Sequence, residues 1–470
     1  MKSIVKIFII GVFITFSFSC EDFLTHTPSD AVEDTDAFNT ANDIQIALNG
    51  AYNSFGDYRF YGRNVLALAD IAADNMWMLG SSGHFDQIYQ YTISADLPDL
   101  MEIWEYGYKV ISQCARLIKA GKEMLASSEI SDDDEEIINS SIAQAYALKA
   151  LSHFTLVNIF GLPYSSANEN TPGIVLIGEE PIAAFQQVQR STVGKTYEHI
   201  LNEIDSAAVH IDLASSSVFS FNTASLFALE ARVKLYMGDF DGAITAAQNA
   251  ISERGGALEL YPENYVNMWF SLSPNTEDIF TIAKLSNDNL SANSLNTLYD
   301  SYDGKASFGL FALFDEDDMR IELFDDDYYG LRALKFDGLP TSRAASNVPV
   351  FRLPEMYLII AEAKAQLGQS EAIDFVYEVA QRNPDLDKAD IPTDKDELLD
   401  FISVERRREL FQEGHRWFDL RRTGEKMTRD EDDLYEIVDW DISKFVYPIP
   451  ANEINASGIK QNENWNANLP

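Results

Sequence analysis

The feature that most constrains the fold is a pair of helical segments joined by a short turn at residues 228–251. The stretch reads ALEARVKLYMGDFDGAITAAQNAI. Residues 238–240, Gly-Asp-Phe, interrupt the helical pattern, and Ala243 and Ala250 leave room for the second helix to approach the first. A hairpin of this kind cannot bury its apolar face alone. Several hairpins must therefore stack to share one core.

A weaker copy of the same pattern occurs at residues 362–376, where residues 367–368, Leu-Gly, supply the turn. Amphipathic segments near residues 44, 104 and 145 bring the number of helical pairs to about four. The repeat resembles a tetratricopeptide unit. These patterns predict an all-α dominated fold with tetratricopeptide-like helical hairpins.

Residues 255–350 do not follow this pattern. They are rich in Asn, Ser, Asp and Gly and contain short β-like pieces such as residues 279–282. A segment of this length is too long for a plain loop, so we expect an irregular, loop-rich subdomain packed on the helices. Two acidic clusters, at residues 314–320 and 324–330, lack the D-x-D-x-D-G order of a calcium loop and are predicted to be solvated surface.

The stretch at residues 405–424, ERRRELFQEGHRWFDLRRTG, combines arginines with apolar and aromatic residues at helical spacing. The pattern predicts a helix, a break near Gly414 and a second helical turn. Guanidinium groups beside aromatic faces are typical of a buried seam. We expect ion pairs that stabilise packing here, and no catalysis.

This stretch resembles the C-terminal signature of the SusD/RagB family of Bacteroidetes outer-membrane nutrient-binding lipoproteins. Further matches flank it: PEMYLIIAEA at residues 354–363, YPIP at 447–450, NEI at 452–454 and KQN at 460–462. The resemblance covers essentially the whole chain. It implies one SusD-like domain over residues 20–470, with the family signature at 354–470 and an insertion at about 255–350 that contributes to the ligand pocket.

The N-terminus is typical of a secretory signal peptide over residues 1–19. Two lysines precede an apolar run at residues 7–18, which is too short to span a bilayer. Cys20 then follows in a sequence that resembles a lipobox, although Ser17 stands where leucine is common. The prediction is acylation of Cys20 and a lipid anchor in the outer membrane, with the protein facing the cell exterior. An ordinary cleaved signal is the alternative.

The net charge of −40, from 75 acidic and 35 basic residues, argues against nucleic acid as a partner. A neutral ligand is easier to reconcile with that charge, which also promotes solubility. The second cysteine, Cys114, lies among apolar residues and is predicted to be a buried hydrophobic side chain. The six histidines show no paired metal-ligand spacing, so no metal and no cofactor are predicted.

Candidate ligand-binding residues occur in the segment at 74–83, where Asp74, Asn75 and Trp77 follow a helix. A planar indole beside Asp and Asn is a common way to hold sugars. The alternative is that Trp77 covers the helix ends. The family resemblance implies a ligand near this segment, shared with the insertion, where Trp269 and Tyr302 are further candidates.

The resemblance implies a cell-surface lipoprotein that binds oligosaccharides without catalysis and delivers them to a SusC-like TonB-dependent transporter. A peptide-binding member of the same family is an alternative. A glycoside hydrolase would need two carboxylates at a fixed separation, and the sequence does not single out such a pair. It also lacks G-x-S-x-G, a phosphate loop and H-E-x-x-H. No enzymatic activity is therefore predicted.

Overall fold

The computed structural model describes residues 37–80, 82–127, 130–183, 186–327, 330–429, 435–463 and 465–470. The predicted signal peptide and Cys20 lie outside these residues. Helices dominate the described part of the chain: α3 (Ala41–Phe55), α4 (Asn64–Ile71), α5 (Asp86–Tyr89), α6 (Pro98–Leu125), α7 (Asp132–Phe160), α8 (Val193–Ala208), α9 (Thr223–Met237), α10 (Phe240–Arg254), α11 (Pro262–Met268), α12 (Leu295–Tyr299), α13 (Phe308–Phe311), α14 (Leu353–Gln366), α15 (Ala372–Ala380), α16 (Lys395–Leu410), α17 (Arg416–Thr423) and α18 (Ala451–Ser457).

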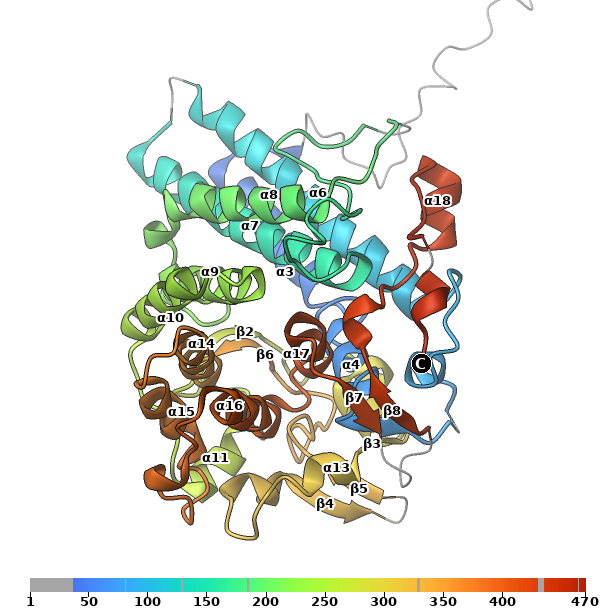
Figure 1. Ribbon diagram of the computed structural model, residues 1–470. Coiled ribbons are helices and arrows are strands. Elements are labelled where there is room, and N and C mark those ends of the chain that lie inside the picture. Colours follow the sequence, from blue (N-terminus) through green and yellow to red (C-terminus); the bar gives the residue numbers. More distant parts are fainter. Residues whose placement is uncertain are drawn as a thin grey trace, which may run out of the picture.

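The long helices stack in pairs. Helix α3 packs against α6, α7 against α8, α9 against α10 and α14 against α15, and the contacts of α10 with α14 join successive pairs. Figure 1 shows this stack from α6, α7 and α8 through α9 and α10 to α14, α15 and α16. The predicted all-α dominated fold with tetratricopeptide-like pairs is confirmed. The hairpin of α9 and α10 turns at Gly238, which has a φ of 75°.

Helix α7 is the centre of the group formed by α3, α6, α7 and α8. Ser131 caps its N-terminus by accepting a hydrogen bond from the backbone N–H of Asp134, and the acidic first turn opposes the positive end of the helix dipole. Nearly all of its residues from Ser141 to Phe160 are buried, because α3, α6 and α8 cover it on different sides. A helix that is buried all round shows little amphipathic pattern.

The strands form three small sheets. The strands are β1 (Met76–Met78), β2 (Asp278–Ile282), β3 (Gly304–Ala306), β4 (Phe324–Asp327), β5 (Gly330–Ala333), β6 (Val348–Arg352), β7 (Met427–Arg429) and β8 (Ile437–Trp440). One sheet has the order β1-β3-β5-β4, and β2–β6 and β7–β8 form antiparallel pairs. The β2–β6 pair packs against α9. Through this contact, part of the segment at 255–350 lies on the helical stack.

The predicted buried seam of ion pairs is present. Glu409 of α16 accepts from Arg320 at 3.3 Å and from Arg352 at 3.0 Å, and it also pairs with Arg382. Arg352 reaches Glu277 at 2.7 Å. All five side chains are 2 % exposed or less. The seam therefore joins α16 to the segment before β2, to the start of α14 and to the end of α15.

The break predicted near Gly414 is also observed, since α16 ends at Leu410 and α17 begins at Arg416. Gly414 has a φ of 81°, and a Cβ there would lie 3.0 Å from the backbone of Leu66. The position favours glycine for both reasons. The close approach brings the C-terminal signature against α4.

Two expectations about local environment were wrong. Trp77 was expected in a loop, but it lies in β1 and is 7 % exposed. The acidic cluster at 314–320 was expected to be solvated, but Asp318 is 1 % exposed because it pairs with Arg320 at 2.7 Å. Asp315 and Asp317 of the same cluster are exposed. The second cluster includes two residues outside the described part of the chain.

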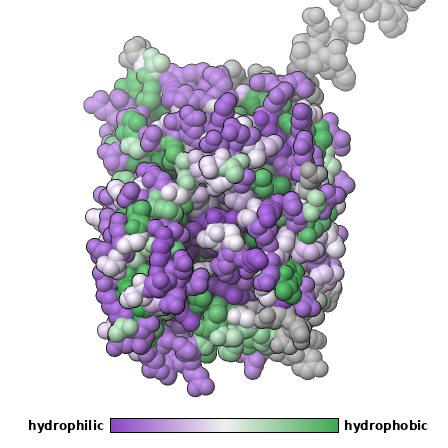
Figure 2. Space-filling view, in the orientation of Figure 1, coloured by the Kyte–Doolittle hydropathy of each residue, from purple (hydrophilic) through white to green (hydrophobic). Residues whose placement is uncertain are grey.

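The surface seen in Figure 2 is largely hydrophilic, with apolar patches interspersed. Cys114 is buried and has a free thiol, as expected. Among the described residues, none of the helices has both the length and the apolar character needed to cross a membrane.

Candidate ligand-binding site

The candidate site begins where β1 pairs with β3 in antiparallel register, with Trp77 opposite Lys305. This pairing brings the segment after β1 beside the segment before β3. The hydroxyl of Ser82 donates to the carbonyl of Tyr302 at 3.0 Å, and the N–H of Leu79 donates to the carbonyl of Asp303 at 3.4 Å. Residues more than two hundred positions apart therefore form one surface.

The most prominent feature of this surface is a stacked pair of rings. The rings of His84 and Tyr302 lie 4.1 Å apart, centroid to centroid, at an interplanar angle of 16°, and both side chains are half-buried. Burial, together with the nearby charge of Arg63, lowers the pKa of His84. The imidazole is therefore neutral near pH 7, and the stack is a flat, uncharged surface.

Charged and polar groups border the stack. Arg63 is 4 % exposed, its guanidinium lies over the rings of Tyr58 at 4.8 Å and Phe85 at 5.7 Å, and its Nη1 donates to Asn293 at 3.4 Å. Asp86 has a buried Oδ1 without a hydrogen-bond partner among the described residues, and burial raises its pKa. The stacked rings thus lie beside a buried cation and a carboxyl group that also accepts from the backbone N–H of Gly83.

Trp77 lies in β1 of the same sheet, and its side chain is held by the protein. Its indole N–H donates to the carbonyl of Ala306 at 2.8 Å, and a Cβ at Gly330 would lie 2.8 Å from its ring. Its ring lies 6.5 Å from that of Phe308, which is 47 % exposed. The N–H of Trp77 is already bonded within the protein, and its side chain is buried. Phe308 is therefore the ring of this pair that faces solvent.

Asp74 and Asn75 are held by arginines of the C-terminal signature. Arg416 donates to both carboxylate oxygens of Asp74, at 2.8 and 2.9 Å, and Arg407 donates to Oδ1 of Asn75 at 2.7 Å. Burial opposes the charged form of Asp74, but Arg407 and Arg416 outweigh it and keep the pKa of this carboxyl well below its usual range. Both residues therefore anchor the start of β1.

Trp269 lies elsewhere, directly after α11. It is 8 % exposed, and its ring is covered by Lys335 at 4.6 Å and by Arg352 at 4.9 Å. Figure 1 shows α11 well separated from β3. The structure therefore brings Asp74, Asn75, Trp77 and Tyr302 to one region and leaves Trp269 in another.

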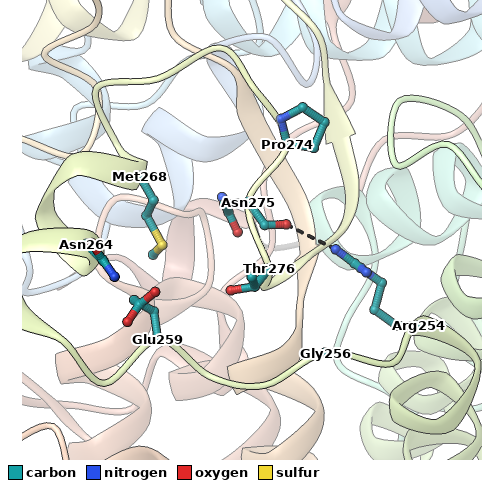
Figure 3. Close-up of a pocket in the computed structure, with 8 residues that line it drawn as sticks. All are labelled: Arg254, Gly256, Glu259, Asn264, Met268, Pro274, Asn275 and Thr276. Carbon is teal, nitrogen blue, oxygen red and sulfur yellow. Dashed lines mark hydrogen bonds between the residues drawn. The ribbon is translucent and has the colours of Figure 1, made fainter.

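A pocket of about 400 Å³ lies beside this second region, within the size range of small-molecule sites. Figure 3 shows the lining residues, which come from the end of α10, from the segment between α10 and α11, from α11 and from the segment that leads into β2. Met268, the neighbour of Trp269 in the chain, is one of them.

Sequence reasoning missed Arg63, His84, Asp86 and Phe308. A signal was available for His84, because an aromatic ring in a loop rich in Ser and Gly invites the interpretation given to Trp77. For Phe308 and Arg63 the sequence offers none, since their position depends on the pairing of β1 with β3 and on the packing of α4.

The structure also brings His153, His199 and Glu203 together, with potential ligand atoms within 4.8 Å of one another. These residues come from α7 and α8, so their proximity could not be read from linear spacing. The ammonium group of Lys149 lies 3.0 Å from Glu203 Oε1, and a metal cation there would be repelled by it. The cluster is accordingly a buried ion-pair group between two helices, and the absence of a metal stays a prediction.

Two stretches of the chain match known families. Residues 331–465 match the family described as "SusD family", and residues 22–235 match the family described as "Starch-binding associating with outer membrane". The SusD-like protein P38 of Formosa agariphila is 24% identical over 90% of this chain and 92% of its own length.

Solved structures of the same superfamily have the same fold. A SusD superfamily protein from Bacteroides vulgatus aligns with a TM-score of 0.82 at 27% identity, over 91% of this chain and 100% of that protein. A SusD superfamily protein from Bacteroides thetaiotaomicron gives 0.80 at 27% identity, over 90% of this chain and 100% of that protein. These matches confirm the resemblance inferred from the C-terminal signature.

Proposed function

Since the chain belongs to the SusD/RagB family of Bacteroidetes, we propose that it is a cell-surface lipoprotein that captures glycans. It delivers them to a SusC-like TonB-dependent transporter without changing them chemically. The family that matches residues 22–235 is described as starch-binding and as associating with the outer membrane, which supports glycan binding and the location at the outer membrane.

The observation that carries the proposal is the stacked pair of His84 and Tyr302 beside Arg63 and Asp86. Sugars present apolar CH faces, which pack on aromatic rings, and hydroxyl groups, which both donate and accept hydrogen bonds. The stack and the exposed ring of Phe308 would serve the CH faces. The carboxylate of Asp86 would accept from hydroxyl groups.

The residues singled out from the sequence have two roles in this proposal. Tyr302 contacts the ligand directly. Asp74, Asn75 and Trp77 act indirectly, since their polar groups are used by Arg416, Arg407 and Ala306 and they hold β1 in place. Trp269 does not belong to this site.

Binding at such a surface is weak. A ring contact contributes about 1 kcal/mol beyond the area it buries, and each hydrogen bond contributes about the same. A few such contacts are compatible with release of the ligand to a transporter. No covalent step is needed, in keeping with a family of non-catalytic binding proteins.

Calorimetry with a panel of neutral oligosaccharides tests the proposal. Tyr302→Ala removes one ring of the stack, and we expect a loss of affinity of about tenfold or more. The control is Tyr377→Ala, which removes a half-buried tyrosine on α15, far from β3. Equal affinity of Tyr302→Ala and the parent protein would contradict the site. Release of reducing ends from any glycan would contradict the non-catalytic function.

The anchor has its own test. Cys20→Ala should move the protein from the membrane fraction to the soluble fraction of lysed cells, because the acceptor of the acyl chains is gone. A variant that stays in the membrane fraction would show that Cys20 is not the anchor.

A further inference from the structure

The pocket of about 400 Å³ near α11 contains several polar groups that the protein leaves unused. Among the described residues, no hydrogen bond is made by the carboxamide of Asn264 or by the hydroxyl of Thr276, and both residues are exposed at the mouth of the pocket. The Nδ2 of Asn275 and the Oε2 of Glu259 are also without one there. In Figure 3 Glu259 and Asn264 approach from one side and Asn275 and Thr276 from the other.

The wall that carries Asn275 and Thr276 is rigid. Arg254 donates to the carbonyl of Asn275 at 3.0 Å and also to the carbonyl of Asp278. The Oδ1 of Asn275 accepts from the backbone N–H groups of Glu277 at 2.8 Å and of Asp278 at 3.1 Å. The carboxamide of Asn275 is therefore held in place before any ligand arrives, which lowers the entropy lost on binding.

The opposite wall is tied to the buried ion-pair seam. The backbone N–H of Glu259 donates to Oε1 of Glu277 at 2.7 Å, and the other carboxylate oxygen of Glu277 pairs with Arg352. Met268 closes this side with a thioether, and Pro274 adds a second apolar surface. The pocket thus combines two apolar surfaces with a ring of hydrogen-bonding groups.

We propose that this pocket is a second binding site, separate from the stack of His84 and Tyr302, for one ring of a neutral polyhydroxylated ligand such as a sugar. Adjacent hydroxyl groups on a sugar ring both donate and accept, and the pocket offers Asn264 and Thr276 for both roles. Its apolar surfaces, Met268 and Pro274, suit the CH faces of the same ring. That the ligand is part of a glycan, rather than another polyol, rests on the proposed function.

Charged ligands fit the pocket less well. An anion would face the carboxylate of Glu259, and the guanidinium of Arg254 is already held by two carbonyl groups. A calcium ion requires six to eight oxygen ligands, and Glu259 is the only carboxylate among the residues that line the pocket. A neutral ligand rich in hydroxyl groups is the kind of ligand that can form hydrogen bonds with all the unpaired side-chain groups of the pocket.

Methyl NMR of the full-length protein labelled with ¹³C at the methionine methyl groups tests this site directly. Met268 lines the pocket, whereas the sulfur of Met78 lies beside Gly304, two residues after Tyr302. The two methyl signals therefore report on the two sites separately. Met268→Leu and Met78→Leu assign the signals. The probes are a panel of neutral disaccharides, with sulfate and Ca²⁺ as probes of charged ligands.

We expect a saturable shift of the Met268 signal with at least one disaccharide. The double variant Asn264→Ala/Thr276→Val should weaken this binding by about tenfold or more. The matched control is Asn267→Ala, which removes an exposed amide of the same helix that does not line the pocket. This control should bind like the parent protein.

The outcomes separate the two proposals. A shift at Met78 with none at Met268 would overturn the second site and leave the proposed function standing. A shift at Met268 with none at Met78 would support the pocket and contradict the site formed by His84 and Tyr302. If neither the Met268 signal nor the Met78 signal shifted with any disaccharide, both proposed binding sites would be overturned. A saturable response at Met268 to sulfate or Ca²⁺, with none to the disaccharides, would overturn the ligand class proposed for the pocket.

Discussion

Glu409 is buried among the guanidinium groups of Arg320, Arg352 and Arg382. Burial opposes its charged form, but these cations outweigh that effect and hold the pKa of the carboxyl well below its usual range. Replacing it with a neutral amide leaves the cations without their common partner. Removing one member of a buried ion pair typically costs 3–5 kcal/mol.

We therefore expect Glu409→Gln to lower the free energy of unfolding by about 3 kcal/mol or more, measured by urea denaturation. Glu378→Gln, at an exposed position on α15, is the control and should change it by less than about 0.5 kcal/mol. A loss below about 1 kcal/mol for Glu409→Gln would mean that the seam contributes little.

His415 gives a pH-dependent effect. It is 8 % exposed, and burial together with the charges of Arg232 and Arg406 lowers its pKa well below the usual value. Below about pH 6.5 the unfolded chain binds a proton at His415 and the folded protein does not. The stability that depends on neutral His415 is thus present above that pH and is lost as the pH falls.

For one such proton the free energy of unfolding falls by up to about 1.4 kcal/mol per pH unit. When the free energy of unfolding is plotted against pH, we expect His415→Gln to remove this contribution to the slope between pH 6 and pH 5. This holds even if the variant is less stable at every pH. Urea titrations of both proteins at each pH measure it. Identical slopes would show that His415 takes up a proton in the folded state.

The chemistry of single side chains was only partly predictable. The sequence indicated that the arginines of the C-terminal signature form a buried seam, because they lie near aromatic residues over a short stretch. It could not indicate that Arg416 would occupy both oxygens of Asp74, since the two residues are 342 positions apart. Only the fold shows which of the polar candidates remain free.

Among helices and turns, the hairpin of α9 and α10 provides a test of backbone geometry. Gly238 has a φ of 75°, and a Cβ there would meet no other atom within 4 Å. Gly238→Ala should therefore cost about 1–2 kcal/mol from the left-handed conformation alone. Gly50→Ala in α3 also meets nothing within 4 Å but has helical geometry, and it should stabilise by about 0.5–1 kcal/mol.

Thermal or urea unfolding of the two variants measures whether the free energy of unfolding falls for Gly238→Ala and rises for Gly50→Ala. Destabilisation by Gly50→Ala, or no change from Gly238→Ala, would contradict the argument. The pair shares one chemical change, the addition of a methyl group, so the difference isolates the backbone conformation.

Helices were predicted well, and strands less so. An amphipathic helix such as α3 or α6 shows its period over several turns, so local sequence suffices. Strand β1 has three residues, too few to show alternation, and its partner β3 lies more than two hundred positions away. The segment around Trp77 therefore looked like a loop, and the four-stranded sheet that supports the candidate site could not be predicted.

For the protein as one body, the seam predicts cooperative unfolding. Arg352 at the start of α14 is bonded to Glu277 next to β2 and to Glu409 and Glu413 of the C-terminal signature. Helical pairs and the segment at 255–350 thus share one buried charge network. We expect a single transition in which far-ultraviolet circular dichroism and tryptophan fluorescence coincide during urea unfolding.

Two separated transitions would show that the segment at 255–350 unfolds independently of the helices. Glu277→Gln provides a second check, since it removes a buried partner of both Arg352 and Arg382. It should shift the whole transition to lower urea rather than split it.

The position of the seam along the chain has a consequence for biosynthesis. Arg320, Arg352 and Arg382 are translated before α16, which carries their shared partner Glu409. Before α16 has left the ribosome, Asp318 and Glu277 are the partners available to these cations, and the carboxylate that all three share is still missing. The seam can therefore be completed only late in synthesis, after α16 has left the ribosome.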